Sequence, residues 1–240
     1  MAIAYDAASN GADSATGTVT WSHTCGGSNR MLFVGVFILG VDNISTVKYN
    51  TVSMTQIGKK TMPTSGNTIY LYALQNPDTG AHTVEIVQAY PMAIFAGCSV
   101  SYTGVKQSIT LDASGTAVNE TASSPYQQSL NSVADNCWHI MAYSGVARTS
   151  TAQDTSRANN ANTYLQMEDK NSAKTPAGSV TLGYTFTGGT NISASVMASF
   201  APYVPPGPIN VKTFNGLAAA SVKTVNGLAI ASVKAKNGLA

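Results

Sequence analysis

Charged side chains are scarce in this sequence. Of its 240 residues, only 10% are Asp, Glu, Lys or Arg, against roughly 25% in an average soluble domain. The polar surface must therefore be built from Ser, Thr, Asn, Gln and Gly, which are weak helix formers compared with Glu, Lys and Arg. This composition argues against a helix-rich fold and is common in extracellular and virion β-proteins.

Several other features are absent. The three cysteines form no C-x-x-C pair, and their odd number argues against a disulfide framework, although one bridge stays open. No apolar run approaches the ~20 residues that span a bilayer, and residues 31–41 (MLFVGVFILGV) are typical of a buried strand. The first residues lack the basic and apolar segments of a signal peptide. We expect no membrane insertion. The protein is then a virion component released by lysis, a protein whose cleaved signal is missing from this sequence, or a protein secreted by another route.

Motifs that carry chemistry are missing as well. The sequence has no G-x-S-x-G elbow, P-loop, H-E-x-x-H or EF-hand loop. Its three histidines, His23, His82 and His139, fall on separate predicted strands, which favours structural roles over a metal site. Glu85 and Glu168 are the candidates for a glycoside-hydrolase carboxylate pair, but no pattern joins them. We expect no enzyme, no cofactor and no metal.

Charge is unevenly distributed along the chain. Residues 211–240 contain Lys212, Lys223, Lys234 and Lys236 and no acidic residue, whereas the formal net charge of the whole chain is +2. Regularly spaced lysines protect strand edges against aggregation more often than they bind nucleic acid. We therefore expect no nucleic-acid partner.

The hydrophobic pattern predicts an all-β fold. Apolar and polar residues alternate with period two in TVTWSH, VTLGYTFTG and NISASVMASF. About eleven such strands with turn signals between them predict a β-sandwich, jelly-roll-like body over 1–203. Residues 112–125 and 146–162 are predicted as long loops, and 126–134 as a short turn of helix. A Pro-rich spacer over 204–210 ends the body.

The last thirty residues contain three copies of an eleven-residue unit: VKTFNGLAAAS, VKTVNGLAIAS and VKAKNGLA. Asn-Gly is the strongest short signal for a two-residue β-hairpin turn. In the second unit it predicts Val225 opposite Leu228 and Thr224 opposite Ala229, within nine-residue strands such as Leu217–Val225. Because a thin meander is only marginally stable alone, we expect 211–240 to be an assembly tail that pairs against the body or, more readily, between subunits. Its predicted assembly turns are Asn215, Gly216, Asn226, Gly227, Asn237 and Gly238.

Four segments of the body carry a resemblance to a known type of module. They are RMLFVGVFI, STVKYNTVSMTQIGK, IYLYALQNPDTGAHTVEIV and CSVSYTGVKQS, within about residues 17–108. This region resembles a β-sandwich module of phage virion proteins and bacterial surface proteins, and the V-K-T-x-N-G-L-A repeats look like tails of similar structural proteins. Asn50-Thr51 departs from the Asn-Gly of that pattern, which predicts a looser or different turn.

The resemblance implies a structural or binding role in a virion or at a cell surface. We expect a fibre, tail or capsid-decoration component that forms a homo-oligomer, packs with other virion proteins and attaches to a host-surface glycan. The alternative is a bacterial adhesin or lectin-like carbohydrate-binding module. The sequence leaves open whether its tyrosines are buried between sheets or contact sugar; Tyr90 is one, and the main candidate glycan contacts are Tyr70, Tyr72, Tyr126 and Tyr164.

Overall fold

The fold is described from a computed structural model. It covers residues 1–11, 17–90, 94–107, 111–120, 124–145, 150–160, 165–186, 192–205, 213–214, 217–218, 224–225 and 228–229. These residues form β-strands and their connections, with no helix among them, which confirms the all-β prediction. The chain divides into two compact units, Met1–Tyr203 (the body) and Val204–Ala240.

The first half of the body forms two antiparallel sheets. Its central sheet has the strand order β1-β9-β3-β7-β6 and its outer sheet the order β2-β8-β4-β5. The strands are β1 (Ala4–Asn10), β2 (Thr18–Cys25), β3 (Met31–Ile38), β4 (Ile44–Tyr49), β5 (Val52–Ser53), β6 (Thr55–Thr61), β7 (Thr68–Gln75), β8 (Gly80–Gln88) and β9 (Phe95–Thr103).

The second half repeats this plan. Its central sheet has the order β10-β17-β12-β15-β14 and its outer sheet the order β11-β16-β13. The strands are β10 (Ala113–Asn119), β11 (Tyr126–Asn131), β12 (Trp138–Gly145), β13 (Ser150–Ala152), β14 (Thr155–Asn160), β15 (Leu165–Asp169), β16 (Ser179–Phe186) and β17 (Ser193–Phe200).

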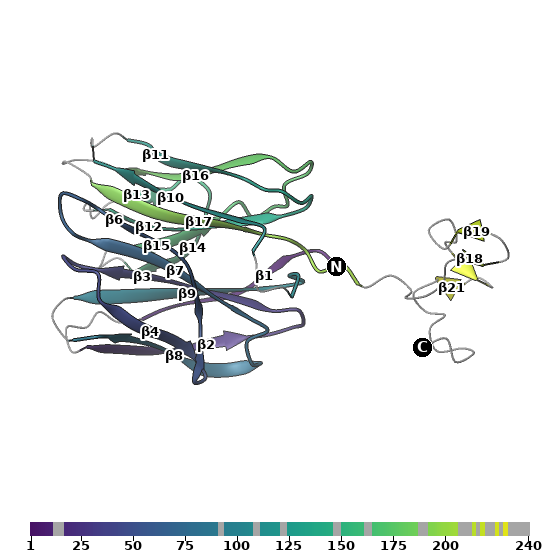
Figure 1. Ribbon diagram of the computed structural model, residues 1–240, viewed down its shortest axis with the longest axis horizontal. Helices are drawn as coiled ribbons and strands as arrows, with labels where there is room; N and C mark the ends of the chain where they lie inside the picture. Colours follow the sequence, from purple (N-terminus) through teal and green to yellow (C-terminus); the bar gives the residue numbers. More distant parts are fainter. Residues whose placement is uncertain are drawn as a thin grey trace. The chain divides into compact units, whose positions relative to one another are not determined.

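The four sheets stack as four layers, with the two central sheets face to face (Figure 1). Apolar side chains fill each of the three spaces between layers. The middle space contains an aromatic cluster in which Phe200 lies 5.0 Å from Phe33 and 4.9 Å from Tyr102 between ring centroids. Strands β3, β9 and β17 are therefore buried on both faces; β3 is a continuous apolar run, whereas β9 and β17 place small serines among their apolar residues.

Apart from the two-residue β5, the two halves match strand by strand, so the body is an internal structural duplication. Met31 of β3 pairs with Tyr102 of β9, and Trp138 of β12 pairs with Phe200 of β17, at the same place in each central sheet. Both halves also have a β-bulge at the same register, between Gln56 and Gly58 in β6 and between Ser156 and Ala158 in β14. The sequence analysis predicted one sandwich and missed this duplication.

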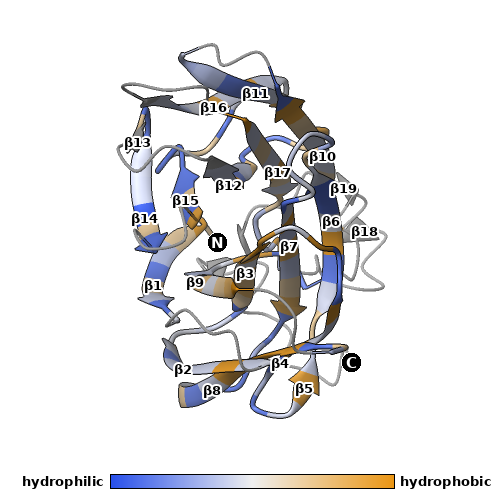
Figure 2. Cartoon of the chain, turned by 90° about the vertical axis from the view of Figure 1, so that its left-hand side faces the viewer, coloured by the Kyte–Doolittle hydropathy of each residue, from blue (hydrophilic) through white to orange (hydrophobic). Residues whose placement is uncertain are grey.

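An approximate twofold axis along the strands relates the halves. The central sheets stack with reversed strand order, so that β1 lies over β14 and β6 over β10 (Figure 2). Equivalent residues meet on the axis: a Cβ atom built on Gly35 would lie 3.2 Å from the Cβ of its counterpart Ala142. Because the axis follows the strands, equivalent strands of the two halves run in the same direction.

Three local predictions were wrong. The predicted loop 112–125 contains β10, the predicted loop 146–162 contains β13 and β14, and the predicted helical turn 126–134 contains β11. Small polar residues on these strands, such as those of ASGTAVN, hid them because the strands bury little apolar surface.

The turn at Asn50-Thr51 also differs from its prediction. It is a tight two-residue turn in which Tyr49 pairs with Val52. Asn50 has a φ of 44° and Thr51 a φ of 70°, the left-handed region that Asn-Gly would adopt. A hydrogen bond of 2.7 Å from Asn50 Nδ2 to Asp78 Oδ2 helps to hold this conformation.

In the second unit the described residues form two short hairpins. Strands β18 (Thr213–Phe214) and β19 (Leu217–Ala218) pair, as do β20 (Thr224–Val225) and β21 (Leu228–Ala229). Val225 lies opposite Leu228 and Thr224 opposite Ala229, the register that a turn at the intervening Asn-Gly predicts. The remainder of the predicted nine-residue strands lies outside the described residues. So do the six predicted turn residues, which are Asn215, Gly216, Asn226, Gly227, Asn237 and Gly238.

Candidate recognition surface

The two ends of the body differ in what they present. At one end the N-terminal ammonium of Met1 donates to the carbonyl oxygen of Tyr203 at 2.9 Å, and the amide of Tyr203 donates to Gly104 at 2.7 Å. The chain therefore enters and leaves the body at the same end. The opposite end, which we call the loop end, carries the described residues of the connections β3–β4, β6–β7 and β8–β9 and, from the second half, Glu120 after β10. Contacts between halves hold it together, such as the hydrogen bonds of 3.0 Å from Thr64 to Glu120.

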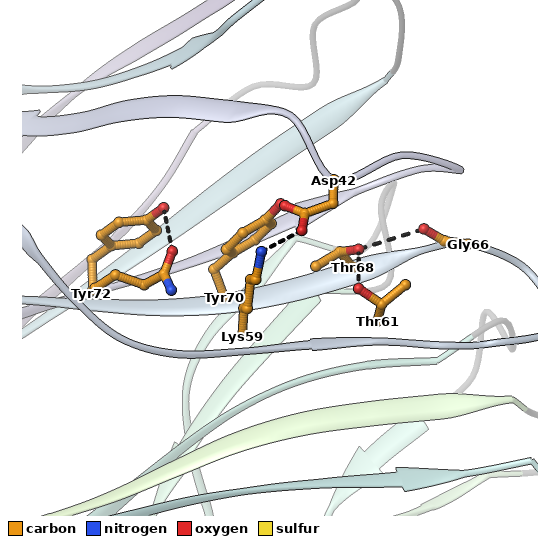
Figure 3. Close-up of polar contacts among 8 residues, drawn as sticks. Asp42, Lys59, Thr61, Gly66, Thr68, Tyr70 and Tyr72 are labelled. Carbon is orange, nitrogen blue, oxygen red and sulfur yellow. Dashed lines mark hydrogen bonds and ion pairs between the residues drawn. The ribbon is translucent and has the colours of Figure 1, made fainter.

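A charged and phenolic cluster lies near the loop end of the first half (Figure 3). Asp42, from the β3–β4 connection, accepts hydrogen bonds from the Tyr70 hydroxyl and from Lys59 Nζ. Beside it the Tyr72 hydroxyl donates to Gln56 Oε1 at 3.3 Å, and the two tyrosine rings stack with centroids 6.1 Å apart. The cluster joins the edge strand β6 to β7 and to a connection 17 residues before Lys59 in sequence.

The electrostatics of this cluster follow from its half-buried position. Partial burial raises the pKa of Asp42, but the hydrogen bonds from Lys59 and Tyr70 and the charge of Lys59 outweigh it, so its pKa is lowered and the carboxylate is ionised. Burial raises the pKa of Tyr70 well above the usual value, and the Asp42 carboxylate adds to the effect. Burial also raises the pKa of Tyr72 to about 12. Near neutral pH the cluster thus holds one ionised carboxylate beside two neutral phenols.

Exposed apolar side chains lie on neighbouring connections of the loop end. Leu39, Tyr90 and Ile94 are 45%, 49% and 47% exposed. The amide of Leu39 donates to the Ile94 carbonyl oxygen at 3.0 Å, and Asn43 Nδ2 donates to the Tyr90 carbonyl oxygen at 2.9 Å. Exposed aromatic and aliphatic side chains on adjoining connections are able to bind a polar ligand with apolar faces.

The candidate glycan contacts are placed differently from Tyr90. Tyr70, Tyr72 and Tyr126 are only 1%, 7% and 4% exposed, so packing between sheets accounts for them and they present no open ring face. The Tyr126 hydroxyl is hydrogen-bonded to Ser195 Oγ at 2.7 Å in the space between the second central and outer sheets. Tyr164 lies outside the described residues.

The histidines and carboxylates do not come together as a reactive site. His23 is buried and bonds Ser99 and Ser101 at 2.9 and 3.0 Å, and His82 bonds the Thr79 carbonyl at 3.1 Å. Glu85 forms a surface ion pair with Lys48 at 3.3 Å in the first half, whereas Glu168 is fully buried in the second.

The described residues contain no arrangement typical of a metal centre. Among them, no three His, Cys, Asp or Glu side chains converge as metal ligands. Cys25, Cys98 and Cys137 are buried free thiols. The described part of the chain has no helix long and apolar enough to cross a membrane.

Comparison with known proteins adds no relative. No family model, no curated protein sequence and no solved structure matches this chain.

The sequence analysis missed Asp42, Lys59, Leu39 and Ile94 as surface candidates. Nothing in the sequence singles out Asp42, because its partners are supplied by strands that only the fold brings close. The apolar residues of the connections carried a weak signal, since large apolar side chains in a turn-rich segment have no strand face to occupy.

Proposed function

We propose that the protein is a non-catalytic structural and attachment protein of a virion, built from a double jelly-roll body and a β-repeat assembly tail. The jelly-roll assignment rests on the strand order: in each half the first strand pairs with the last, and most successive strands alternate between the two sheets. The observation that carries the function is the polarity of the body. Both its termini lie at one end, and the opposite end presents Thr64 of the first half bonded to Glu120 of the second.

Such polarity suits a protein that is held at one end and makes contact at the other. The tail leaves from Tyr203, so subunits joined through their tails would keep the loop end free for a partner. Low charge and a Ser/Thr/Asn-rich surface fit a particle exposed outside cells. In this proposal the protein forms homo-oligomers, packs with other virion proteins and contacts a host-surface glycan.

The assembly role is tested by deleting 204–240 and measuring mass by light scattering. We expect the full chain to be an oligomer and the truncated body a monomer. An oligomer of unchanged mass would disprove assembly through the tail. Mass spectrometry of purified particles would test incorporation directly.

A bacterial adhesin or lectin-like module is the second candidate. It is supported by the exposed Tyr90 of the loop end, whose carbonyl oxygen accepts a hydrogen bond from Asn43, the residue after Asp42. On a glycan array, Tyr90→Ser and Asp42→Asn should reduce binding, whereas Val133→Ser, at an exposed residue of the opposite end, should not. Equal binding by all variants, or no binding by the native chain, would remove the glycan role.

A further inference from the structure

The duplicated fold produces two equivalent grooves along the interface between the central sheets. One runs between the edge strands β1 and β14, and the other between β6 and β10; Figure 2 shows these two pairs of strands on opposite sides of the body. Because the twofold axis relates the two grooves, the residues that line one can be compared with those at the equivalent positions of the other.

Arg157 fills the β1/β14 groove. It is the extra residue of the β14 bulge, and its guanidinium carbon lies 4.1 Å from the centroid of the Tyr5 ring. Its Nε donates to Asp169 Oδ2 at 2.8 Å, and its terminal nitrogen donates to Asn171 Oδ1 at 2.6 Å. The Tyr102 hydroxyl donates to the same Asp169 oxygen at 2.6 Å.

The β6/β10 groove has apolar residues at the matching positions. The strand registers place Ile57, the extra residue of the β6 bulge, where the other half has Arg157. Ala73 likewise occupies the position that Asp169 has in the second half. Ala73 pairs with Phe33, the third residue of β3, and Asp169 pairs with Ile140, the third residue of β12. Phe200 likewise takes the place of Tyr102. The cation, its counter-ion and the phenol are all replaced by apolar side chains.

These replacements leave an open cavity of about 170 Å³ in the β6/β10 groove, lined by Met31, Ile57, Ala73, Gln75 and Leu111 among others. A second cavity of about 120 Å³, lined in part by Phe200, adjoins it and shares two of these residues. Gln75, the counterpart of Asn171, contributes a buried Nε2 that has no hydrogen-bond partner among the described residues. A buried amide donor without an acceptor is unfavourable, so the cavity requires one polar contact from its occupant.

We propose that this groove binds one uncharged aromatic group that carries a hydroxyl, with the size and chemistry of a tyrosine side chain. The cavity is close to the roughly 150 Å³ that holds a benzene ring in an engineered protein core. A cation such as that of Arg157 is disfavoured because Ala73 supplies no counter-ion, and the Asp112 carboxylate, which lines the adjoining cavity, already accepts hydrogen bonds from Ser199 and two backbone amides. A phenolic oxygen can accept from the Gln75 amide, and its O–H can donate if the amide is turned over.

The test uses p-cresol, the side-chain analogue of tyrosine, with the full chain and ligand-observed NMR titration. We expect saturable binding at one site, with toluene bound about 3- to 10-fold more weakly because it lacks the hydrogen bond. In Gln75→Leu the preference for p-cresol over toluene should disappear.

Filling the groove should abolish binding. Ile57→Arg with Ala73→Asp rebuilds the Arg157–Asp169 pair in the first half, and Leu111→Trp fills the cavity from a partly exposed position should the double variant fail to fold. Leu39→Ser, at the loop end, is the matched control and should bind p-cresol as the native chain does. Absence of saturable binding, equal affinities for p-cresol and toluene, or unchanged binding by both filled variants would overturn the proposal.

A parallel titration with N-acetyl-tyrosinamide identifies the source of the group. Binding of this compound indicates a tyrosine residue of a polypeptide, and binding of p-cresol alone indicates a free phenol.

Discussion

Lowering the pH from 6.5 to 4.5 should destabilise the body through two buried histidines. His23 and His139 are each only 1% exposed, and burial lowers the pKa of each to about 4. In the unfolded chain a histidine takes up a proton near pH 6.5. Below that pH the unfolded state therefore binds protons that the folded state does not, and the free energy of unfolding falls until the folded pKa is reached.

Glu168 acts in the opposite direction over part of the same range. It is fully buried, and burial, together with nearby Asp154, raises its pKa to about 8. In the unfolded chain the pKa of Glu168 is near 4.5, and below this pH its raised folded-state pKa makes its full contribution to stability. This contribution falls as the pH rises and is lost once the pH passes 8.

The magnitude follows from counting protons. Each group contributes about 1.4 kcal/mol per pH unit between its two pKa values. From pH 4.5 to 6.5 the two histidines outweigh Glu168, so the free energy of unfolding should rise by about 1.4 kcal/mol per unit, or about 3 kcal/mol in all. From pH 6.5 to 8 Glu168 acts alone and the slope reverses, which places the stability maximum near pH 6.5.

Urea denaturation at half-unit steps from pH 4.5 to 8 measures these slopes. His139→Leu should make the profile flat between pH 4.5 and 6.5, because one histidine then balances Glu168. Glu168→Gln should double the acid slope to about 2.7 kcal/mol per unit and remove the alkaline decline. A native profile without a maximum, or the same acid slope in native protein and His139→Leu, would refute the reasoning.

The sequence predicted the fold class because half-buried strands show their period directly. In β2 the buried Val19 and His23 alternate with exposed threonines and a serine. The same argument failed for β10, whose small side chains bury too little apolar surface to show a period. It also left the β7 tyrosines undecided, since a strand between two sheets is buried on both faces.

The duplication cannot be recognised in the sequence because equivalent positions of the two halves carry chemically different residues. Ile57 and Arg157 occupy the same bulge position, and Ala73 and Asp169 the same pairing position, yet no residue-by-residue likeness connects them. The candidate surface shares this limit. The contacts of Asp42 with Lys59 and Tyr70 depend on how the β3–β4 connection meets β6 and β7, which local patterns do not encode.

Three further predictions concern stability, each measured by chemical denaturation. Gly35→Val should cost about 1–3 kcal/mol, because its Cβ would lie 3.1–3.2 Å from side chains of the facing central sheet. Thr51→Gly should stabilise the protein by about 1 kcal/mol, since a β-branched residue is strained at a φ of 70°. The two aspartates that form ion pairs with Lys59 and Arg157 should differ sharply in the free energy of unfolding that is lost on substitution. Asp42→Ala should cost at most about 1 kcal/mol, because Asp42 and Lys59 are 38% and 47% exposed and water screens the pair. Asp169→Ala should cost about 3–5 kcal/mol, because Asp169 is fully buried, Arg157 is only 11% exposed, and the loss leaves a largely buried cation without its partner. Adding Arg157→Leu to Asp169→Ala removes that cation and should restore part of the loss. If the double variant is no more stable than Asp169→Ala alone, the penalty does not arise from the unpaired charge and the interpretation of the filled groove is wrong.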